Sequence, residues 1–143
     1  MPIKVGLIGL GYWGANYLRL LSDLRQHFKL EAVCDKNLAS LREASEKYGV
    51  SVFSNYEEMF ETDLEAMFIV TNPPEHFLIA SRCLETGKHI LIEKPLVLTG
   101  VEARYLTSLA REKNLKLMVA HTFIFNSAIR EIKRMLDDNK KRD

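Results

Sequence analysis

The sequence predicts a single α/β domain formed around a doubly wound, mostly parallel sheet. Short runs that are almost wholly apolar alternate with stretches of helical periodicity along the chain. A strand with one solvent-exposed face alternates apolar and polar residues, and these runs do not. The strands are therefore expected to be buried on both faces. Helices must then cover both sides of the sheet, and 143 residues are enough for one such domain with its own core.

The first half of the chain is predicted to form three strands joined by two helices. Residues 3–8 are an apolar run that ends in glycines. Residues 29–34 alternate and then become apolar, which indicates a second strand. Residues 37–48 have helix-forming composition and stop at Gly49, a common helix-ending residue, before a short third strand at 50–53. The apolar stripe of the first helix consists of Tyr17, Leu18, Leu21 and Leu24.

The second half repeats the alternation of strand and helix. A buried strand at 66–70 is followed by the breaker 71–74, whose Pro74 suits the first turn of a helix that runs to about Thr86 and stops at Gly87. The last helix is amphipathic, and packing is the expected role of its apolar face. The other expected elements are a short helix at 56–60, strands at 88–92 and 116–120, and helices at 100–113 and 126–139. The apolar face of the last helix consists of Ile129, Ile132, Met135 and Leu136, and the charged tail 140–143 is expected to fray.

The bulk composition is that of an ordinary globular protein. Hydrophobic residues make up 47% and charged residues 27%, and the formal net charge of +1 gives no electrostatic argument for binding nucleic acid or an anionic membrane. No apolar run approaches the roughly 20 residues of a membrane span, and the N-terminal residues lack the pattern of a signal peptide. Cys34 and Cys83 lie outside any CxxC or Cys/His cluster, so we expect two reduced core cysteines of a cytoplasmic protein and no metal site.

The turn after the first strand has the spacing of a dinucleotide-binding loop. The stretch Gly9-Leu10-Gly11-Tyr12-Trp13-Gly14 follows a strand directly and opens a helix. In such a loop the first glycine permits a tight turn, Gly11 lets the backbone approach a pyrophosphate, and Gly14 lets the helix pack closely on the sheet. The helix N-terminus adds free N–H groups and a partial positive charge. The alternative is that these are turn glycines with no ligand.

Asp35 supplies the acceptor that the adenosine ribose of a dinucleotide needs. It ends the second strand, 21 residues after Gly14. A carboxylate there accepts the 2′- and 3′-hydroxyls and repels a 2′-phosphate, which favours NAD over NADP. Lys36 follows directly and softens that preference. Methyltransferases also combine a glycine-rich first turn with an acid after the second strand, but the placement of Gly14 inside the helix argues against that class.

Three polar clusters are expected to meet at the edge of the sheet where the glycine turn lies. They follow three different strands, at 71–76, at Glu93-Lys94-Pro95 and at His121-Thr122. Ligands of an open α/β sheet bind beyond the carboxyl ends of its strands. The charged end of the fifth strand is therefore a site candidate rather than a solvated loop. His27 and His89 are expected to be ordinary surface or strand-end histidines.

Together these residues resemble the glucose–fructose oxidoreductase/inositol dehydrogenase (Gfo/Idh/MocA) family, whose nucleotide-binding domain has the Rossmann fold. The resemblance covers the whole chain, and Glu93-Lys94-Pro95 after the fifth strand is its most specific part. Tyr12-Trp13-Gly14 together with residues 120–123 looks like the branch that oxidises nucleotide-linked amino sugars and related sugars. The implied activity is that of an NAD-dependent oxidoreductase, a dehydrogenase acting on the CH–OH group of a sugar, nucleotide sugar or cyclitol.

Carried onto this sequence, the resemblance implies one catalytic residue and a set of cofactor-binding residues. Lys94 is implied to lie between nicotinamide and substrate and to assist proton transfer from the sugar hydroxyl, a role that burial of its amine favours. The Glu93 carboxylate is expected to face the cofactor rather than to pair with Lys94, and the bond to Pro95 can be cis, as in family members. The implied cofactor-binding residues are Gly9, Leu10, Gly11, Tyr12, Trp13, Gly14, Asp35, Thr71, Asn72, Pro73, His76, Glu93, Lys94 and His121.

The resemblance also implies a division of the chain. Residues 1–121 correspond to the NAD(P)-binding Rossmann domain, and residues 122–143 to a connecting segment and helix that lead to a substrate domain absent from this chain. That second domain supplies most sugar contacts and the oligomer interface in family members. The full-length protein is therefore expected to be a homo-oligomer, and this chain alone to be inactive. The rival interpretation is a stand-alone module that senses the NAD/NADH ratio and regulates a partner, which would need no amine at Lys94.

Overall fold

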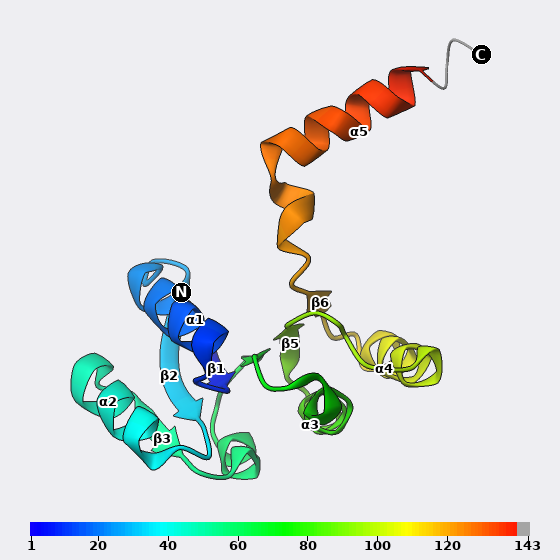
Figure 1. The fold of residues 1–143 in the computed structure, drawn as a ribbon. Helices are drawn as coiled ribbons and strands as arrows, with labels where there is room; N and C mark the ends of the chain where they lie inside the picture. Colours follow the sequence, from blue (N-terminus) through cyan, green and yellow to red (C-terminus); the bar gives the residue numbers. More distant parts are fainter. Residues whose placement is uncertain (140–143) are drawn as a thin grey trace.

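The fold is a six-stranded, all-parallel sheet with helices on both faces (Figure 1). A computed structural model describes residues 1–139, so the charged tail 140–143, expected to fray, lies outside the described residues. The strand order is β3-β2-β1-β4-β5-β6, which confirms the predicted doubly wound sheet. The strands are β1 (Ile3–Ile8), β2 (Phe28–Cys34), β3 (Ser51–Phe53), β4 (Ala66–Ile69), β5 (His89–Ile92) and β6 (Leu117–Val119).

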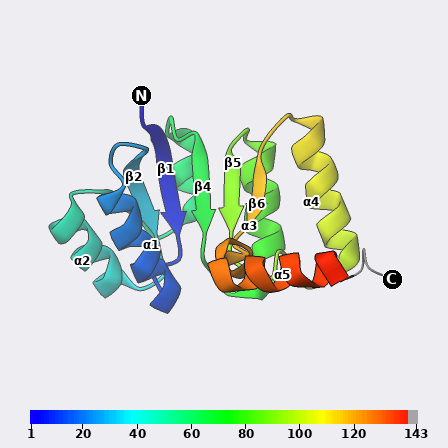
Figure 2. The ribbon, with the colours of Figure 1, turned by 90° about the horizontal axis from the view of Figure 1, so that it is seen from above.

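Two groups of helices cover the two faces of the sheet (Figure 2). Helices α1 and α2 share one buried core, and η1, α3 and α4 share the other. The helices are α1 (Tyr12–Asp23), α2 (Leu38–Tyr48), α3 (Pro73–Glu85), α4 (Gly100–Glu112) and α5 (Ser127–Asn139), with short 3₁₀ helices η1 (Tyr56–Glu61) and η2 (Thr122–Phe125).

Strand β4 shows why the apolar runs are continuous. Met67 and Ile69 belong to the core under α3 and α4, whereas Phe68 and Val70 belong to the core under α1 and α2. Successive side chains of a strand point to opposite faces, so a strand covered on both sides needs apolar residues at every position. The side chains of Met67, Phe68, Ile69 and Val70 are all buried.

The helix boundaries follow from local capping chemistry. The side chain of Asn37 accepts hydrogen bonds from two backbone N–H groups at the start of α2, and Gly49 ends that helix with φ +66°. Thr99 and Glu102 form a reciprocal capping box at the start of α4. These interactions satisfy N–H groups that the helix itself leaves without a partner.

The predicted elements differ from the observed ones mainly at their ends. Helix α1 begins at Tyr12, so Gly14 lies within its first turn. The short helix predicted at 56–60 is the 3₁₀ helix η1, and η2 is a further 3₁₀ turn in the segment predicted only as a connection. Hydrophobic periodicity does not mark such single turns, because they are too short to show a period.

Helix α5 stands away from the sheet (Figure 1). Among the described elements, η2 is the one that it contacts most. The predicted apolar face, Ile129, Ile132, Met135 and Leu136, is 46–59% exposed, so packing within the described residues does not cover it. Among residues 1–139, none of the helices has the length and apolar character required to cross a membrane.

The register of the sheet brings the candidate site residues to one level. Ile8 at the end of β1 is paired with Cys34 of β2 and with Ile69 of β4. Ile69 is paired with Ile92 of β5. The segments that begin at Gly9, Asp35, Val70 and Glu93 therefore leave the sheet side by side. The order of the strands reverses at β1, with β2 and β3 on one side of it and β4 to β6 on the other. Ligands of open α/β sheets bind at the carboxyl end of such a reversal.

Candidate functional site

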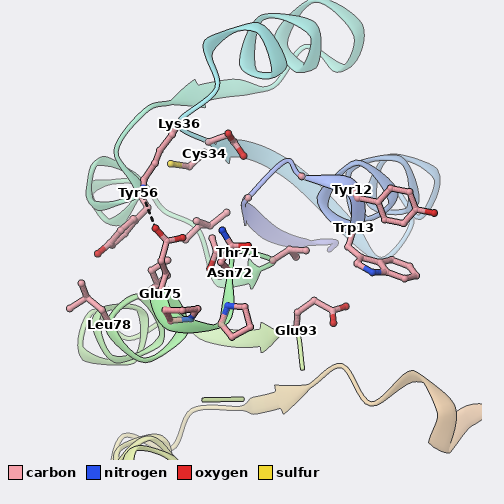
Figure 3. A pocket seen from close by; sticks show the side chains of 18 of the residues that line it. Tyr12, Trp13, Cys34, Lys36, Tyr56, Thr71, Asn72, Glu75, Leu78 and Glu93 are labelled. Carbon is pink, nitrogen blue, oxygen red and sulfur yellow. Dashed lines mark hydrogen bonds and ion pairs between the residues drawn. The ribbon is translucent and has the colours of Figure 1, made fainter. Parts of the chain in front are cut away.

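A cavity of about 820 Å³ lies at the carboxyl edge of the sheet (Figure 3). Its walls come from the glycine turn, the end of β2, the segment after β3, the start of α3 and the end of β5. The lining residues are Ile8, Gly9, Gly11, Tyr12, Trp13, Cys34, Asp35, Lys36, Ser54, Tyr56, Val70, Thr71, Asn72, Pro73, Pro74, Glu75, Leu78, Ile79, Glu93 and Lys94. The three clusters predicted to converge thus contribute in part: the two after β4 and β5 line the cavity, and the one after β6 does not.

The glycine turn is packed too tightly for side chains at two positions. Gly9 has φ +99°, and a Cβ there would lie 2.4 Å from the carbonyl oxygen of Val70. A Cβ on Gly14 would lie 2.0 Å from the carbonyl oxygen of Gly9. The turn therefore sits directly against β4, and α1 sits directly against the turn.

Gly11 differs from both, because a Cβ there would meet nothing within 4 Å. Its backbone conformation, with φ −64°, is one that every residue can adopt. Neither the conformation nor the packing of the chain therefore requires a glycine at this position. Gly11 is the N-cap of α1, and no side chain of the described residues caps that helix or places an acid in its first turn. The cavity therefore faces uncapped N–H groups at the positive end of a helix, a favourable environment for phosphate oxygens.

Asp35 lines the cavity and also holds the turn in place. Its Oδ2 accepts a hydrogen bond from the backbone N–H of Leu10 at 2.5 Å, and its Oδ1 accepts one from the N–H of Asn37 at 2.7 Å. Each carboxylate oxygen can accept a further hydrogen bond, so ribose hydroxyls remain within its capacity. Cys34 lies beside it, and burial, followed by the charge of Asp35, raises the pKa of that thiol to about 11.

Lys36 and Glu75 form an ion pair across the cavity mouth (Figure 3). The Lys36 Nζ lies 2.6 Å from Glu75 Oε1. Lys36 follows β2 and Glu75 lies in the first turn of α3, so the pair joins two walls of the cavity. The hydrogen bond from the ammonium to Glu75, together with the charge of that carboxylate, raises the pKa of Lys36.

The segment after β4 brings Thr71, Asn72 and Pro73 to the cavity, as predicted for a cleft-lining turn. Within the described residues, the Thr71 hydroxyl oxygen is the one buried side-chain polar atom without a hydrogen-bond partner. A buried hydroxyl normally has a partner, so this one is available to a polar group that enters the cavity.

His76 is a correction to the sequence interpretation. It was expected to line the cleft, but its side chain is fully buried and is not part of the cavity wall. Its Nδ1 lies 2.8 Å from the Pro95 carbonyl oxygen, and its Nε2 lies 3.1 Å from the Thr71 carbonyl oxygen. The ring therefore lies behind the wall, between the turns after β4 and β5, and its N–H can donate to a carbonyl oxygen of one of them.

Glu93 lines the cavity, and its carboxylate is held by two donors. The Tyr17 hydroxyl donates to Oε1 at 2.8 Å, and the Lys94 backbone N–H donates to Oε2 at 3.1 Å. Burial and the hydrogen bond to Glu93 raise the pKa of Tyr17 well above its ordinary value. The side chain of Lys94 is exposed, and the Lys94–Pro95 peptide bond is cis.

The remaining predicted residues lie at the rim or outside the cavity. Tyr12 and Trp13 line it with rings that meet edge to face, with a centroid distance of 5.6 Å, and both are largely exposed. Leu10 and Gly14 shape the turn but do not line the cavity, and His121 is exposed at the end of β6. Among the described residues there is also no group of three or more His, Cys, Asp or Glu side chains arranged to hold a metal ion.

Sequence reasoning missed the role of several side chains. Tyr17 was placed only on an apolar stripe, although its hydroxyl holds Glu93. Glu75 was part of a quoted turn without a role, although it pairs with Lys36. Tyr56 and Leu78 were not singled out, and they line the cavity. A tyrosine on an apolar stripe of a helix that starts at a ligand site is a usable signal, since a buried hydroxyl needs a partner.

The geometry fits a dinucleotide cofactor. Gly11 leaves open space beside uncapped N–H groups for a pyrophosphate, Asp35 offers acceptors for a ribose, and Thr71 offers a hydroxyl without a partner. Strand, turn, helix, strand and acid follow in the order that this class of domain requires. The fold and the cavity together define a dinucleotide-binding Rossmann domain.

Sequence comparison supplies the family. Residues 3–121 match the oxidoreductase family with an NAD-binding Rossmann fold, Gfo/Idh/MocA, and the chain belongs to that family. An inositol 2-dehydrogenase of Salmonella typhimurium is 26% identical over 145 residues, an alignment that covers 98% of this chain. A UDP-N-acetylglucosamine 3-dehydrogenase of Acidithiobacillus ferrooxidans is 28% identical over 132 residues and 92% of this chain.

Solved structures show the same fold with different cofactors. A scyllo-inositol dehydrogenase of Lactobacillus casei with bound NAD(H) and scyllo-inositol superposes with a TM-score of 0.90, 29% identity and coverage of 98% of this chain. A 3-ketoreductase of Actinomadura kijaniata in complex with NADP and TDP-benzene superposes with a TM-score of 0.88, 28% identity and coverage of 96%.

The chain spans less than half of the relatives that it matches. It covers 43% of the inositol 2-dehydrogenase and 41% of the UDP-N-acetylglucosamine 3-dehydrogenase. It covers 42% of the scyllo-inositol dehydrogenase structure and 43% of the 3-ketoreductase structure.

Proposed function

We propose that this chain is the cofactor-binding part of an NAD-dependent dehydrogenase that acts on the CH–OH group of a sugar, nucleotide sugar or cyclitol. The observation that carries the proposal is the cavity at the carboxyl edge of the sheet, where the glycine turn, Asp35 and Lys94 line one continuous space. The inositol and nucleotide-sugar dehydrogenases among the relatives support the substrate class.

The proposed cofactor runs from Asp35 to Glu93 along this cavity. Its pyrophosphate lies against Gly11 and the N-terminus of α1, because backbone can approach closely there and the helix end is uncapped. Asp35 accepts from the adenosine ribose, and the Thr71 hydroxyl gains the partner that it otherwise lacks. Glu93, held by Tyr17, faces the nicotinamide end.

Lys94 is the proposed catalytic residue. NAD supplies the chemistry of hydride acceptance from the carbon that carries the hydroxyl, and the hydroxyl proton passes to the Lys94 amine. That step requires a neutral amine, which burial favours. Lys94 is exposed to solvent among residues 1–139, so we propose that further chain, as found in the longer relatives, covers it.

The proposal assigns the preference for NAD to Asp35. A carboxylate that accepts ribose hydroxyls also repels a 2′-phosphate. The solved relatives include both an NAD(H) complex and an NADP complex, so the family alone does not fix the cofactor. Isothermal titration of this chain with NAD and with NADP tests the assignment. Tighter binding of NAD supports it, and equal binding contradicts it.

Substrate turnover is expected to need more than this chain. Hydride transfer needs the substrate carbon held close to the nicotinamide in an aligned site. We propose that residues 122–139 lead to the part that holds the sugar, and that this chain alone forms no NADH from inositols or nucleotide sugars. Production of NADH that depends on such a sugar, measured at 340 nm with the purified chain, would contradict this.

A Lys94→Ala variant separates the enzyme from an NAD/NADH-sensing module. In a dehydrogenase with the full length of the relatives, the variant is expected to abolish turnover while the Kd for NAD changes by a few-fold or less. A collapse of NAD binding instead would identify Lys94 as a cofactor ligand and contradict the catalytic assignment. Full turnover in the variant would also contradict the catalytic assignment, whereas a full-length wild type that binds NAD without any turnover would favour the module that senses the cofactor.

A further inference from the structure

We infer that Glu75 is a second determinant of cofactor selectivity, because its ion pair with Lys36 withholds that lysine from a 2′-phosphate. The inference deepens the proposed function and rests on it, since it concerns which dinucleotide the cavity selects. In the sequence, the negative charge of Asp35 disfavours binding of NADP, and the positive charge of Lys36 favours it. The structure adds a third charge, the Glu75 carboxylate of α3, which determines whether Lys36 is free to bind a phosphate.

The geometry links Glu75 to the adenosine end of the cavity. Asp35 and Lys36 follow β2 in succession, so a phosphate on a ribose held by Asp35 lies within the range of the neighbouring lysine. The Lys36 amine lies 2.6 Å from Glu75 Oε1 (Figure 3). All three side chains line the same cavity.

The charges facing Lys36 all favour NAD. Its side chain is 87% exposed and that of Glu75 is 38% exposed, so the pair is weak and can be broken. A 2′-phosphate would have to displace Glu75 from Lys36 and then lie beside two carboxylates, those of Glu75 and Asp35. Ribose hydroxyls meet neither difficulty, because they are uncharged and only donate to Asp35. Glu75 therefore disfavours NADP twice, by occupying Lys36 and by repulsion.

Among the described residues that line the cavity, Lys94 is the one cation besides Lys36, and it follows β5 rather than β2. The Asp35 carboxylate also acts on the Lys36 amine, in the same direction as Glu75. Replacing the Glu75 carboxylate with an amide of the same shape leaves Lys36 as a free cation at the cavity mouth. The predicted change is in the ratio of the two affinities, rather than in the fold.

The test compares Glu75→Gln with two further variants. Dissociation constants for NAD and NADP are measured by titration calorimetry, and those for AMP and adenosine 2′,5′-bisphosphate report on the adenosine end alone. Glu46→Gln is the matched control, since Glu46 pairs with Arg42 at 3.3 Å on the surface of α2 and does not line the cavity. The double variant Glu75→Gln/Lys36→Met removes the cation that the proposal frees.

Glu75→Gln is expected to shift the Kd ratio by roughly fivefold in favour of NADP, the upper end of what an exposed pair contributes. Adenosine 2′,5′-bisphosphate should gain over AMP by a similar factor, and the gain should shrink as salt is raised. Glu46→Gln should leave the ratio unchanged, and the double variant should lose the gain.

Two results would overturn the inference in distinguishable ways. If the wild-type chain binds NAD and the ratio in Glu75→Gln stays at the wild-type value, the inference fails while the proposed function stands. If the double variant keeps the whole gain, Lys36 is not the group that Glu75 withholds, and the inference also fails. If the wild-type chain binds neither dinucleotide, the proposed function fails, and the inference fails with it.

Discussion

Adding one methyl group to Gly9 is expected to lower the free energy of unfolding by about 2–5 kcal/mol. The residue has φ +99°, a conformation that costs an L-residue roughly 1–2 kcal/mol. The new Cβ would also lie 2.4 Å from the Val70 carbonyl oxygen. The hydrogen bond from Val70 N–H to the Ile8 carbonyl oxygen anchors Val70 and limits how far its own carbonyl can move, so the overlap costs a further 1–3 kcal/mol or so. The sum is a large part of the roughly 5–15 kcal/mol that a domain has in total.

Gly11→Ala is the matched control, because it makes the same chemical change two residues along the same turn. Its Cβ meets nothing within 4 Å, so stability should stay within about 1 kcal/mol of the wild type. The methyl group does occupy the space proposed for the pyrophosphate, and the affinity for NAD should fall by roughly tenfold, the effect of about 1.4 kcal/mol of overlap.

Urea unfolding followed by far-UV circular dichroism measures the first effect, and calorimetric titration measures the second. The structure predicts that the Gly9 variant loses stability and that the Gly11 variant loses affinity. An unchanged urea midpoint for Gly9→Ala would refute the packing argument. Equal destabilisation of both variants would show that the turn does not distinguish them.

Three other predictions follow from the packing around the site and from α5. Tyr17→Phe should cost about 1–2 kcal/mol below pH 10, because it leaves the Glu93 carboxylate without one donor. The folded-state pKa of Tyr17 lies above its ordinary 10.0, so wild-type stability should fall as the pH rises beyond 10 through that folded value. Urea midpoints that fall equally steeply with pH in the variant would argue against a contribution from Tyr17. His76→Leu should cost about 1–3 kcal/mol, because the carbonyl oxygen that accepts from the buried ring N–H loses its donor, and thermal unfolding at the wild-type temperature would contradict the role given to the ring. The exposed face of α5 should drive self-association that Ile132→Ser/Leu136→Ser abolishes, and sedimentation velocity that finds a monomeric wild type at high concentration would exclude it.

The sheet and the glycine turn were predictable because their signals are local. An apolar run such as 66–70 needs no knowledge of its neighbours to be recognised as a buried strand, and the spacing of Gly9, Gly11 and Gly14 is contained in six residues. Once the parallel strands are aligned by their carboxyl ends, the register of the sheet follows. Asp35 and Glu93, which each follow a strand end, then lie at the same edge of the sheet.

The interactions that tune the site were not predictable, because they join residues far apart in sequence. Tyr17 and Glu93 are 76 positions apart, and Lys36 and Glu75 are 39 apart. Neither pairing changes the hydrophobic pattern of its element. His76 was misplaced for a related reason. A histidine after a strand end can face the cleft or the backbone behind it, and only the fold decides which carbonyl oxygens are close enough to bind it.

The most direct test of the proposed cofactor site is a calorimetric titration of this chain with NAD, repeated with the Gly11→Ala variant. We expect saturable binding of NAD to the wild-type chain and a loss of affinity of roughly tenfold in the variant. Wild-type binding that the methyl group leaves untouched would show that NAD binds elsewhere. Absence of NAD binding to the wild-type chain would contradict the claim that residues 1–139 form a working dinucleotide site.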